Sequence, residues 1–563
     1  MSEERRTHRR VLVIGWDGGT WNVFRPLVEH GLMPNLKSLM ARGCCGIMNS
    51  TLPPITPPAW TTLLTGLNPE KHGVFGFLEG LLPGETPGRD GSRPLSALSI
   101  RAKTLLDLLG GADRRVMAIN VPMSYPPREV NGIMITGMLT PAGSENYTYP
   151  AELKNELKDY AIDVAWDADM LVHMKKIDEI GLPTLVRECT EIARSRSENI
   201  LRLAENHPWD FAIVIFTSTD RLFHRLWPEI GALLKSGVPG TKLERLLLDF
   251  FAQLDESLGD ILRACSDAFT MLVSDHGFGP RASRTVYPDV VLEQGGLLFR
   301  KKQAPTRRGL ELRLRRGVRS LIEALLPKGM AQGLLSKGRS RQRRMSESID
   351  HERTLAQVVM FDWFVTGGVR LAKETTAVMN DAEREELIDR IIELMRGIRD
   401  PETGETVVED VWRREQKFPD AVVDFLPEII MKFRAGYTGR INPLATEAVS
   451  GAPDGSENGV HCVEGMFVLA GEGIKALGES PAMHLADIAP SVLYMSGMDS
   501  PTYMQGKVPL ALFREEYVKE HPLRIRDYAD GGNATADEKP SSAYTKEQAE
   551  QVKDHLRHLG YME

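Results

Sequence analysis

Short apolar runs recur along the chain, and their recurrence constrains the fold more than any other feature of the sequence. They are rich in β-branched and aromatic side chains, and they cover residues 11–16, 116–121, 132–135, 211–216, 269–273 and 466–469. Stretches with helical spacing, such as residues 243–262, separate most of them. A short continuous apolar run is typical of a strand buried on both faces. Strands that alternate with helices predict a doubly wound α/β fold with a mostly parallel sheet and helices on both faces.

Acidic and histidine residues lie next to four of these runs. They are Asp17 after the first run, Asp220 and His224 after residues 211–216, Asp275 and His276 after residues 269–273, and His461 just before residues 466–469. Ligands of doubly wound sheets bind beyond the carboxyl ends of the strands. We therefore expect these side chains to meet at one edge of the sheet.

Carboxylate and imidazole side chains are ligands that suit zinc or a similar divalent ion. Each motif alone is weak evidence: Asp220 and His224 share one helix face, but such pairs are common on protein surfaces, and Asp275-His276-Gly277 could equally form a turn. Together and in this order they favour a metal site. Two ions can hold a phosphoryl group between an attacking and a leaving oxygen, so the set predicts a phosphate-ester hydrolase.

Thr56-Pro57-Pro58 has the pattern of a helix start, with Thr56 as N-cap and proline just inside the helix. The amino end of a helix offers free N–H groups to an anion. This pattern predicts that Thr56 lies beside a bound phosphate.

Composition narrows the class of protein. The chain has 563 residues and 42% hydrophobic content, enough for one large domain with insertions or for two domains. Its net charge of -8 argues against a general nucleic-acid binder. The five cysteines show no disulfide spacing, which predicts a reducing compartment and buried structural roles. Residues 1–10 are charged, and no apolar run approaches the ~20 residues of a membrane span. We expect a cytoplasmic protein.

Residues 300–344 form a basic segment with fifteen lysines and arginines against two glutamates. Leu310, Leu314, Val318, Leu321 and Leu325 add an apolar stripe at helical spacing. Such a helix can lie on an anionic membrane surface, or it can be a lid whose stripe packs on the main domain, which we favour. We expect residues 1–515 to form one domain with an insertion at about 296–348. A linker and a C-terminal helix would then occupy residues 516–563, the linker at about 527–542 and the helix at 545–559.

The chain resembles the alkaline phosphatase superfamily. Within it, the chain is most similar to the type I phosphodiesterase and nucleotide pyrophosphatase branch and to bacterial and archaeal proteins labelled predicted phosphohydrolase or phosphomutase. The similarity runs from Val11 to about Gly506 and includes Pro69-Glu70-Lys71-His72-Gly73, residues 121–127 and residues 487–494. It implies an alkaline phosphatase-like core.

The resemblance also implies roles for single residues. It assigns Asp220, His224 and His461 to one metal, and Asp17, Asp275 and His276 to the other. Thr56 aligns with the nucleophile and is also a metal ligand, which implies a phosphothreonine intermediate that water then hydrolyses. The implied cofactors are two divalent ions, zinc first and manganese as the alternative.

One position departs from the nucleotide pyrophosphatases. Those enzymes place an asparagine that holds a phosphate oxygen shortly after a His-Gly pair, here His72-Gly73, and the aligned residue in this chain is Phe77. This departure argues against a nucleotide diester as substrate. We interpret His72 as structural.

Several functions stay open at this point. A threonine nucleophile favours a phosphodiester slightly over a monoester, and the substrate class is a small-molecule or lipid-linked phosphate ester. A phosphomutase of the cofactor-independent phosphoglycerate mutase kind is the close alternative. A sulfatase is excluded because Thr56-Pro57-Pro58-Ala59-Trp60 lacks the required Cys/Ser-x-Pro-x-Arg motif. A non-catalytic protein that binds anionic ligands is the alternative from another class.

Overall fold

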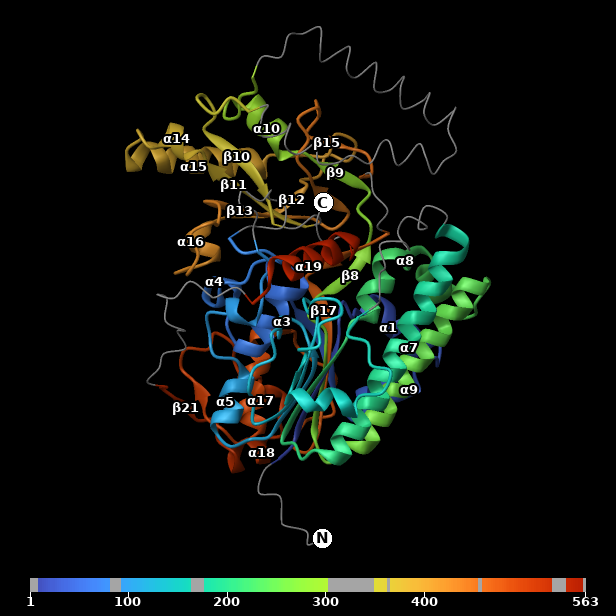
Figure 1. The fold of residues 1–563 in the computed structure, drawn as a ribbon. Coiled ribbons are helices and arrows are strands. Elements are labelled where there is room, and N and C mark those ends of the chain that lie inside the picture. The colour runs from blue at the N-terminus through green and yellow to red at the C-terminus, as the bar shows by residue number, and fades with distance from the viewer. Residues whose placement is uncertain are drawn as a thin grey trace.

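The structure is a computed structural model that describes residues 9–80, 93–163, 177–301, 349–361, 365–453, 458–528 and 543–559. It has a large α/β core and a smaller cap (Figure 1). The cap is an insertion in the core, since the chain leaves the core after β8 (Gly277–Pro280) and returns with β16 (Gly459–Cys462).

The core is built on a ten-stranded sheet with the order β18-β2-β17-β7-β1-β6-β3-β4-β5. Its edge strands are β18 (Gly478–Glu479) and β5 (Thr148–Tyr149), and β19 (Met483–His484) also pairs with β2. Its centre is parallel: β1 (Val11–Trp16) lies between β6 (Phe211–Phe216) and β7 (Phe269–Val273), and β3 (Val116–Val121) and β4 (Gly132–Thr136) follow β6. On the other side, β17 (Glu464–Ala470) is antiparallel to both β7 and β2 (Gly43–Asn49). The predicted doubly wound, mostly parallel sheet is confirmed.

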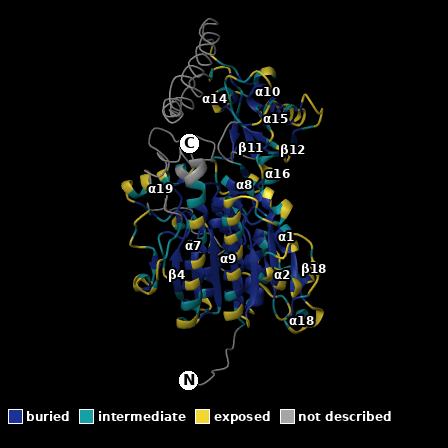
Figure 2. Ribbon diagram, turned by 90° about the vertical axis from the view of Figure 1, so that its right-hand side faces the viewer, coloured by how far each residue is buried: buried dark blue, intermediate teal, exposed yellow. Residues whose placement is uncertain are grey.

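Helices cover both faces of this sheet and leave its strands buried (Figures 1 and 2). One face packs against α1 (Trp21–Glu29), α2 (Pro34–Ala41), α7 (Ile177–Asn206), α8 (Ser218–Ser236) and α9 (Lys242–Ala264). The other packs against α3 (Thr56–Thr65), α5 (Leu105–Gly111) and α17 (Ile488–Met495). Since the six residues of β1 are all buried, their side chains supply the core on both faces.

The cap has a four-stranded antiparallel sheet of its own. Its order is β10 (Ala356–Met360), β11 (Thr366–Leu371), β13 (Ile429–Phe433) and β12 (Val408–Arg413), and α15 (Asp381–Arg396) packs on it. A separate apolar cluster joins cap and core: Leu52 and Phe75 of the core contact Val359, Phe361, Phe418, Leu426 and Ile430 of the cap. The cap is therefore docked on the segment that leads into α3.

Residues 21–29 and 34–41 form two separate helices, α1 and α2, because the chain turns before Pro34. The start of α3 differs by one residue from its prediction. Thr56 is the first helical residue of α3, and Ile55 takes the N-cap position without a side-chain hydrogen bond. Four of the cysteines are buried as predicted, whereas Cys462 is only partly buried.

Some predictions fall on other parts of the chain. The basic segment from residue 302 and most of the 527–542 linker lie outside the described residues. After the predicted boundary at residue 515, Tyr517 of α18 (Glu515–Glu520) is buried in the core, and α19 (Lys546–Leu559) buries Val552 and Leu556 against it. The division at residue 515 stays a prediction. Among the described helices, none is both long and apolar enough to cross a membrane.

Candidate metal centre

Neighbouring strands deliver the predicted ligands to one edge of the core sheet. Asp17 follows β1, Asp220 lies in the first turn of α8 just after β6, and Asp275 and His276 link β7 to β8. Because β1, β6 and β7 are parallel and in register, their carboxyl ends coincide. His461 reaches the same place from β16, which pairs with β8 so that His461 lies opposite Phe278.

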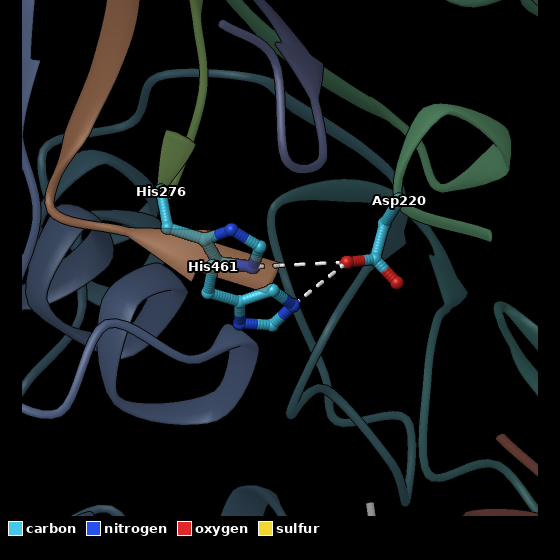
Figure 3. A group of neighbouring side chains, drawn as sticks. All are labelled: Asp220, His276 and His461. Carbon is cyan, nitrogen blue, oxygen red and sulfur yellow. Dashed lines mark hydrogen bonds and ion pairs between the residues drawn. The ribbon is translucent and has the colours of Figure 1, made fainter. Parts of the chain in front are cut away.

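One group of ligand atoms surrounds Asp220. Its Oδ1 lies 3.1 Å from His461 Nε2, 3.5 Å from His224 Nε2 and 3.9 Å from His276 Nε2. Figure 3 shows the carboxylate pointing at the rings of His276 and His461. All of these residues are buried, with at most 4% of their surface exposed.

A second group contains Asp17, Asp275 and His276. His276 Nε2 lies 3.4 Å from Asp275 Oδ2 and 3.6 Å from Asp17 Oδ1, both closer than its 3.9 Å to Asp220 Oδ1. Each group could hold one metal ion by the proximity of its ligand atoms. The structure thus brings the six predicted side chains together and places His276 between the two groups.

Main-chain carbonyls fix the protonation of the three imidazoles. The Nδ1 atoms of His224, His276 and His461 lie 3.3, 3.2 and 3.0 Å from the carbonyl oxygens of Gly459, Gly277 and Pro54. A carbonyl oxygen only accepts, so each Nδ1 carries the proton and each neutral ring directs the lone pair of Nε2 into the site. This is the arrangement in which imidazole binds a metal.

Two of these Nε2 lone pairs face each other at a distance that is unfavourable unless a proton or a cation lies between them. The Nε2 atoms of His224 and His461 are 2.9 Å apart, although both rings already donate through Nδ1. Several carboxylate and imidazole atoms of the second group are also buried without a hydrogen-bond partner: Asp17 Oδ1, Asp275 Oδ2 and His276 Nε2. Buried acceptors without donors cost free energy. Divalent cations would satisfy all of them, so the side chains fit a two-metal centre.

Burial and like charge perturb the titration of the same residues. Burial, with the neighbouring carboxylates, raises the pKa of Asp17 and Asp275. Burial also lowers the pKa of His276 and His461. At Asp220 burial is outweighed by contacts with His224, His461 and Arg221, which hold its pKa below the usual range. Neutral imidazoles beside Asp17 and Asp275, whose charged forms burial disfavours, are the electrostatic setting that a divalent cation stabilises.

Thr56 belongs to the helix that faces this centre. Trp60 of the same helix donates from Nε1 to Asp17 Oδ2 at 3.4 Å, and Pro54 accepts from His461. Thr56 itself is 1% exposed, and its Oγ1 has no hydrogen-bond partner. The expectation of several free N–H groups at this helix start is wrong, because Pro57 and Pro58 have none. In the first turn, only the N–H of Thr56 could donate to an anion, because the next N–H, that of Ala59, donates to the carbonyl oxygen of Ile55.

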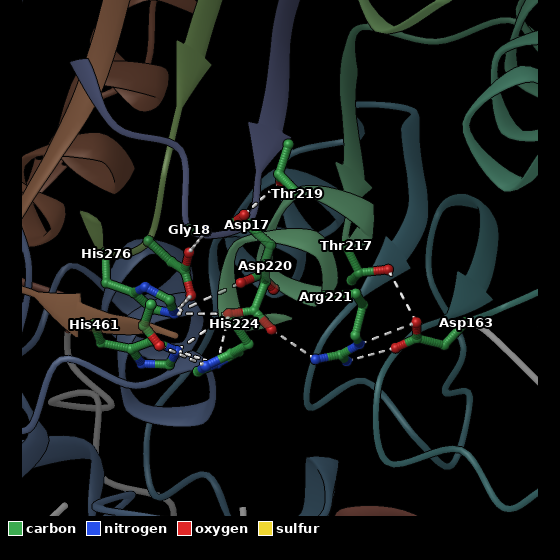
Figure 4. A network of polar contacts seen from close by, with 12 residues as sticks. Asp17, Gly18, Asp163, Thr217, Thr219, Asp220, Arg221, His224, His276 and His461 are labelled. Atoms are coloured by element: carbon green, nitrogen blue, oxygen red, sulfur yellow. Dashed lines mark hydrogen bonds and ion pairs between the residues drawn. The ribbon is translucent and has the colours of Figure 1, made fainter. Parts of the chain in front are cut away.

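Other residues of the centre were not identified from the sequence. Thr219 Oγ1 donates to the carbonyl oxygen of Asp17 at 2.5 Å. Arg221 bridges the carboxylates of Asp220 and Asp163, and Figure 4 shows this network running from the histidines to Asp163. Arg221 directly follows the candidate ligand Asp220, so the sequence could have indicated it, whereas nothing in the sequence marks Asp163.

Phe77, which aligns with the asparagine of the nucleotide pyrophosphatases, and His72 are both buried in the core. Phe77 is 3% exposed and belongs to the apolar cluster on one face of the core sheet. His72 lies in α4 (Pro69–His72), and its ring bonds Thr62 Oγ1 at 2.9 Å and the N–H of Val74 at 3.2 Å.

Comparisons with known proteins identify the family of the chain. Residues 11–442 match the model of the family described as type I phosphodiesterase / nucleotide pyrophosphatase. No curated protein sequence matches the chain significantly. Phosphonoacetate hydrolase from Sinorhizobium meliloti is similar in structure, with 14% identity, a TM-score of 0.49 and coverage of 82% of this chain and 89% of its own. Murine ectonucleotide pyrophosphatase / phosphodiesterase 5 has 11% identity, a TM-score of 0.42 and coverage of 87% and 95%.

Proposed function

The chain belongs to the type I phosphodiesterase / nucleotide pyrophosphatase family of phosphoester hydrolases, and we propose that it is a two-metal phosphohydrolase with Thr56 as nucleophile. The observation that supports this most is the pair of Nε2 atoms of His224 and His461, 2.9 Å apart, each on a ring that already donates through Nδ1. A proton cannot serve both rings without charging one of them in a buried site, whereas a shared cation can.

Each residue then has a definite role. Asp220, His224 and His461 would hold one cation, and Asp17, Asp275 and His276 the other, with Thr56 Oγ1 beside them. The cations would lower the pKa of the Thr56 hydroxyl and stabilise the leaving oxygen. Thr56 Oγ1 forms a bond to phosphorus as the ester oxygen departs, and water then cleaves the phosphothreonine. The N–H of Thr56 would donate to a phosphate oxygen, in place of the side chain that Phe77 cannot supply.

We propose zinc as the metal, with manganese as the alternative, and a phosphodiester slightly ahead of a monoester. The preference for a diester rests on the threonine nucleophile. The substrate is a small-molecule or lipid-linked ester and not a nucleic acid.

Metal content and a substrate panel test the proposal together. The protein is loaded with zinc or manganese and assayed with p-nitrophenyl phosphate, bis-p-nitrophenyl phosphate and a phenylphosphonate ester. We expect two ions per chain and faster cleavage of the diester. Faster cleavage of p-nitrophenyl phosphate would overturn the diester preference. Phosphoryl transfer within 3-phosphoglycerate without release of phosphate would support the mutase, and a protein without bound metal or turnover would support a binding function.

The nucleophile is tested by substitution of Thr56. Thr56→Ala should lower kcat by about three orders of magnitude or more, while two metals still bind because the six other ligands remain. Thr56→Ser, which keeps a hydroxyl, should retain much of the activity. Acid-quenched mass spectrometry should detect a phosphorylated residue at position 56 in the wild type and not in Thr56→Ala. Near-normal turnover of Thr56→Ala at equal metal content would contradict a covalent role.

A further inference from the structure

The two carboxylate oxygens of Asp220 face different partners. Oδ1 points toward His461, His224 and His276 at 3.1 to 3.9 Å. Oδ2 accepts from Arg221 NH1 at 2.7 Å, on the opposite side. Asp220 therefore presents a single oxygen to the metal centre, and a buried arginine holds the other.

Arg221 is itself held by a second carboxylate. Its NH2 donates to Asp163 Oδ2 at 2.6 Å and its Nε approaches Asp163 Oδ1 at 3.3 Å, a bidentate pair (Figure 4). The side chains of Arg221, Asp163 and Asp220 are 3%, 9% and 0% exposed. A buried guanidinium between two carboxylates is a strong and directional interaction. It also places one positive charge close to any cation that Asp220 binds, and Asp163 offsets that charge.

The loop that carries Asp163 is anchored separately to the end of β6. Arg196 is 1% exposed; its NH1 donates to the carbonyl oxygen of Ile215 in β6, and its NH2 donates to those of Ala161 and Ile162. Asn120 at the end of β3 donates to the same Ile215 carbonyl at 3.2 Å. Asp163 is thus fixed relative to the strand from which Asp220 extends.

We propose that Asp163 and Arg221 are positioning residues that mainly set the affinity of one metal site, the site that contains Asp220. They act by directing Asp220 Oδ1 toward the cation and by balancing the charge of the guanidinium. The inference rests on the proposed two-metal function. It adds to that function a charged pair outside the ligand set with an unequal effect on the two ions.

Asp163→Asn tests the pair with a nearly isosteric change. Without the charge of Asp163, Arg221 repels the nearby cation more strongly and holds Asp220 less firmly. Zinc titrations in a chelator-buffered solution should show the affinity of one site falling about tenfold or more while the other stays within about twofold. Anomalous scattering from crystals at limiting zinc should assign the weakened site to Asp220, His224 and His461.

Asp400→Asn is the matched control, since Asp400 forms a bidentate pair with Arg284 in the cap, at 2.9 and 2.7 Å. It should lower stability without changing either zinc affinity. If Asp163→Asn fails to fold, Arg221→Lys provides the second test. Lysine keeps the charge but cannot bridge both carboxylates in the same way, and we expect the same selective loss of affinity at one site.

The outcomes separate the two proposals. Wild-type protein that binds neither zinc nor manganese would overturn the proposed function itself. Two wild-type zinc sites that Asp163→Asn and Arg221→Lys leave unchanged, or weaken equally, would overturn the positioning role alone.

Discussion

Main-chain carbonyl groups decide the chemistry of this centre residue by residue. Pro54, Gly277 and Gly459 each accept from an imidazole Nδ1, which turns three Nε2 lone pairs inward. A hydrogen bond of this kind selects the tautomer and orients the ring before any metal arrives. Each carboxylate is also held through one oxygen: Asp220 Oδ2 accepts from Arg221, Asp17 Oδ2 accepts from Trp60 Nε1, and Asp275 Oδ1 accepts from the N–H of Gly18.

Single substitutions should separate the two metals. His461→Ala and Asp220→Asn should each lower occupancy of one metal by about tenfold or more, and Asp275→Asn should lower the other, because a lost ligand affects its own ion most. Anomalous scattering from crystals of the three variants measures this. Equal loss of both metals in all three variants would contradict the division of ligands.

His72 is a buried histidine outside the metal centre, and its titration should destabilise the fold in acid. Burial lowers its pKa to about 3, from 6.5, and Nδ1 accepts from the N–H of Val74, so a proton there breaks this bond. The stability that neutral His72 contributes is complete above pH 6.5 and is lost as pH falls from 6.5 toward 3. The slope is about 1.4 kcal/mol per pH unit.

Urea unfolding of the metal-free protein at a series of pH values measures this contribution. His72→Gln should be less stable at neutral pH and should lose less stability between pH 6.5 and 4 than the wild type. His351→Gln is the control, because His351 is exposed. A pH dependence of His72→Gln that equals that of the wild type would rule out His72 as the titrating group.

At the scale of elements, the two strands that join core and cap are also the strands of the metal centre. His276 directly precedes β8, and His461 lies within β16, its antiparallel partner. This pair of strands passes very close to β17, since a Cβ added at Gly277 would lie 1.9 Å from the carbonyl oxygen of Glu464. The close approach at Gly277 therefore helps to set the position of His276.

Two glycines of β8 provide a matched test of this packing. Gly277→Ala should push β8 away from β17, with a cost of about 1–3 kcal/mol, and should lower zinc occupancy through displacement of His276. Gly279→Ala, in the same strand, should change neither, since no atom lies within 4 Å of its added Cβ. Thermal unfolding and zinc content measure both variants. Identical behaviour of the two would show that the close approach at Gly277 has no effect on the site.

At the scale of the whole molecule, the cap is fixed to the core near Thr56, the proposed nucleophile. Phe75 of the core makes edge contacts with Phe418 and Phe425 of the cap, at ring distances of 5.3 and 5.8 Å. Beside them the N–H of Val422 donates to the carbonyl oxygen of Glu70 at 2.8 Å. Since Thr56 is 1% exposed, access of a substrate depends on how the cap meets this surface.

Phe418→Ala should loosen the cap without affecting the metals. Loss of a buried phenyl ring costs about 3–5 kcal/mol in a protein core. Here the loss should weaken the docking of the cap on the core. Hydrogen exchange should rise in β10 and β13, and both zinc affinities should stay within about twofold of the wild type. Val378→Ala, at a cap residue that is 89% exposed, is the control. Unchanged exchange in Phe418→Ala would mean that other contacts hold the cap.

The sequence by itself determined six strands of the core, helices such as α9 between them and the six side chains that we propose as metal ligands. Those features depend on local pattern and on ligand chemistry, which the residues carry with them. The sequence also held the absence of N–H groups at Pro57 and Pro58, which our interpretation of the helix start overlooked. The helix at Thr56 was misplaced by one residue because caps are decided by backbone angles and not by residue type alone.

Only the tertiary structure decided how distant residues combine. His461 meets His224 across 237 positions of the chain, and Asp163 meets Arg221 across 58, without a spacing that marks either pair. Such contacts form because parallel strands bring their ends to one edge and because buried charges must find partners there. The same is true of the carbonyl groups that orient the imidazoles, since every residue has a carbonyl and only the fold selects which ones face a histidine.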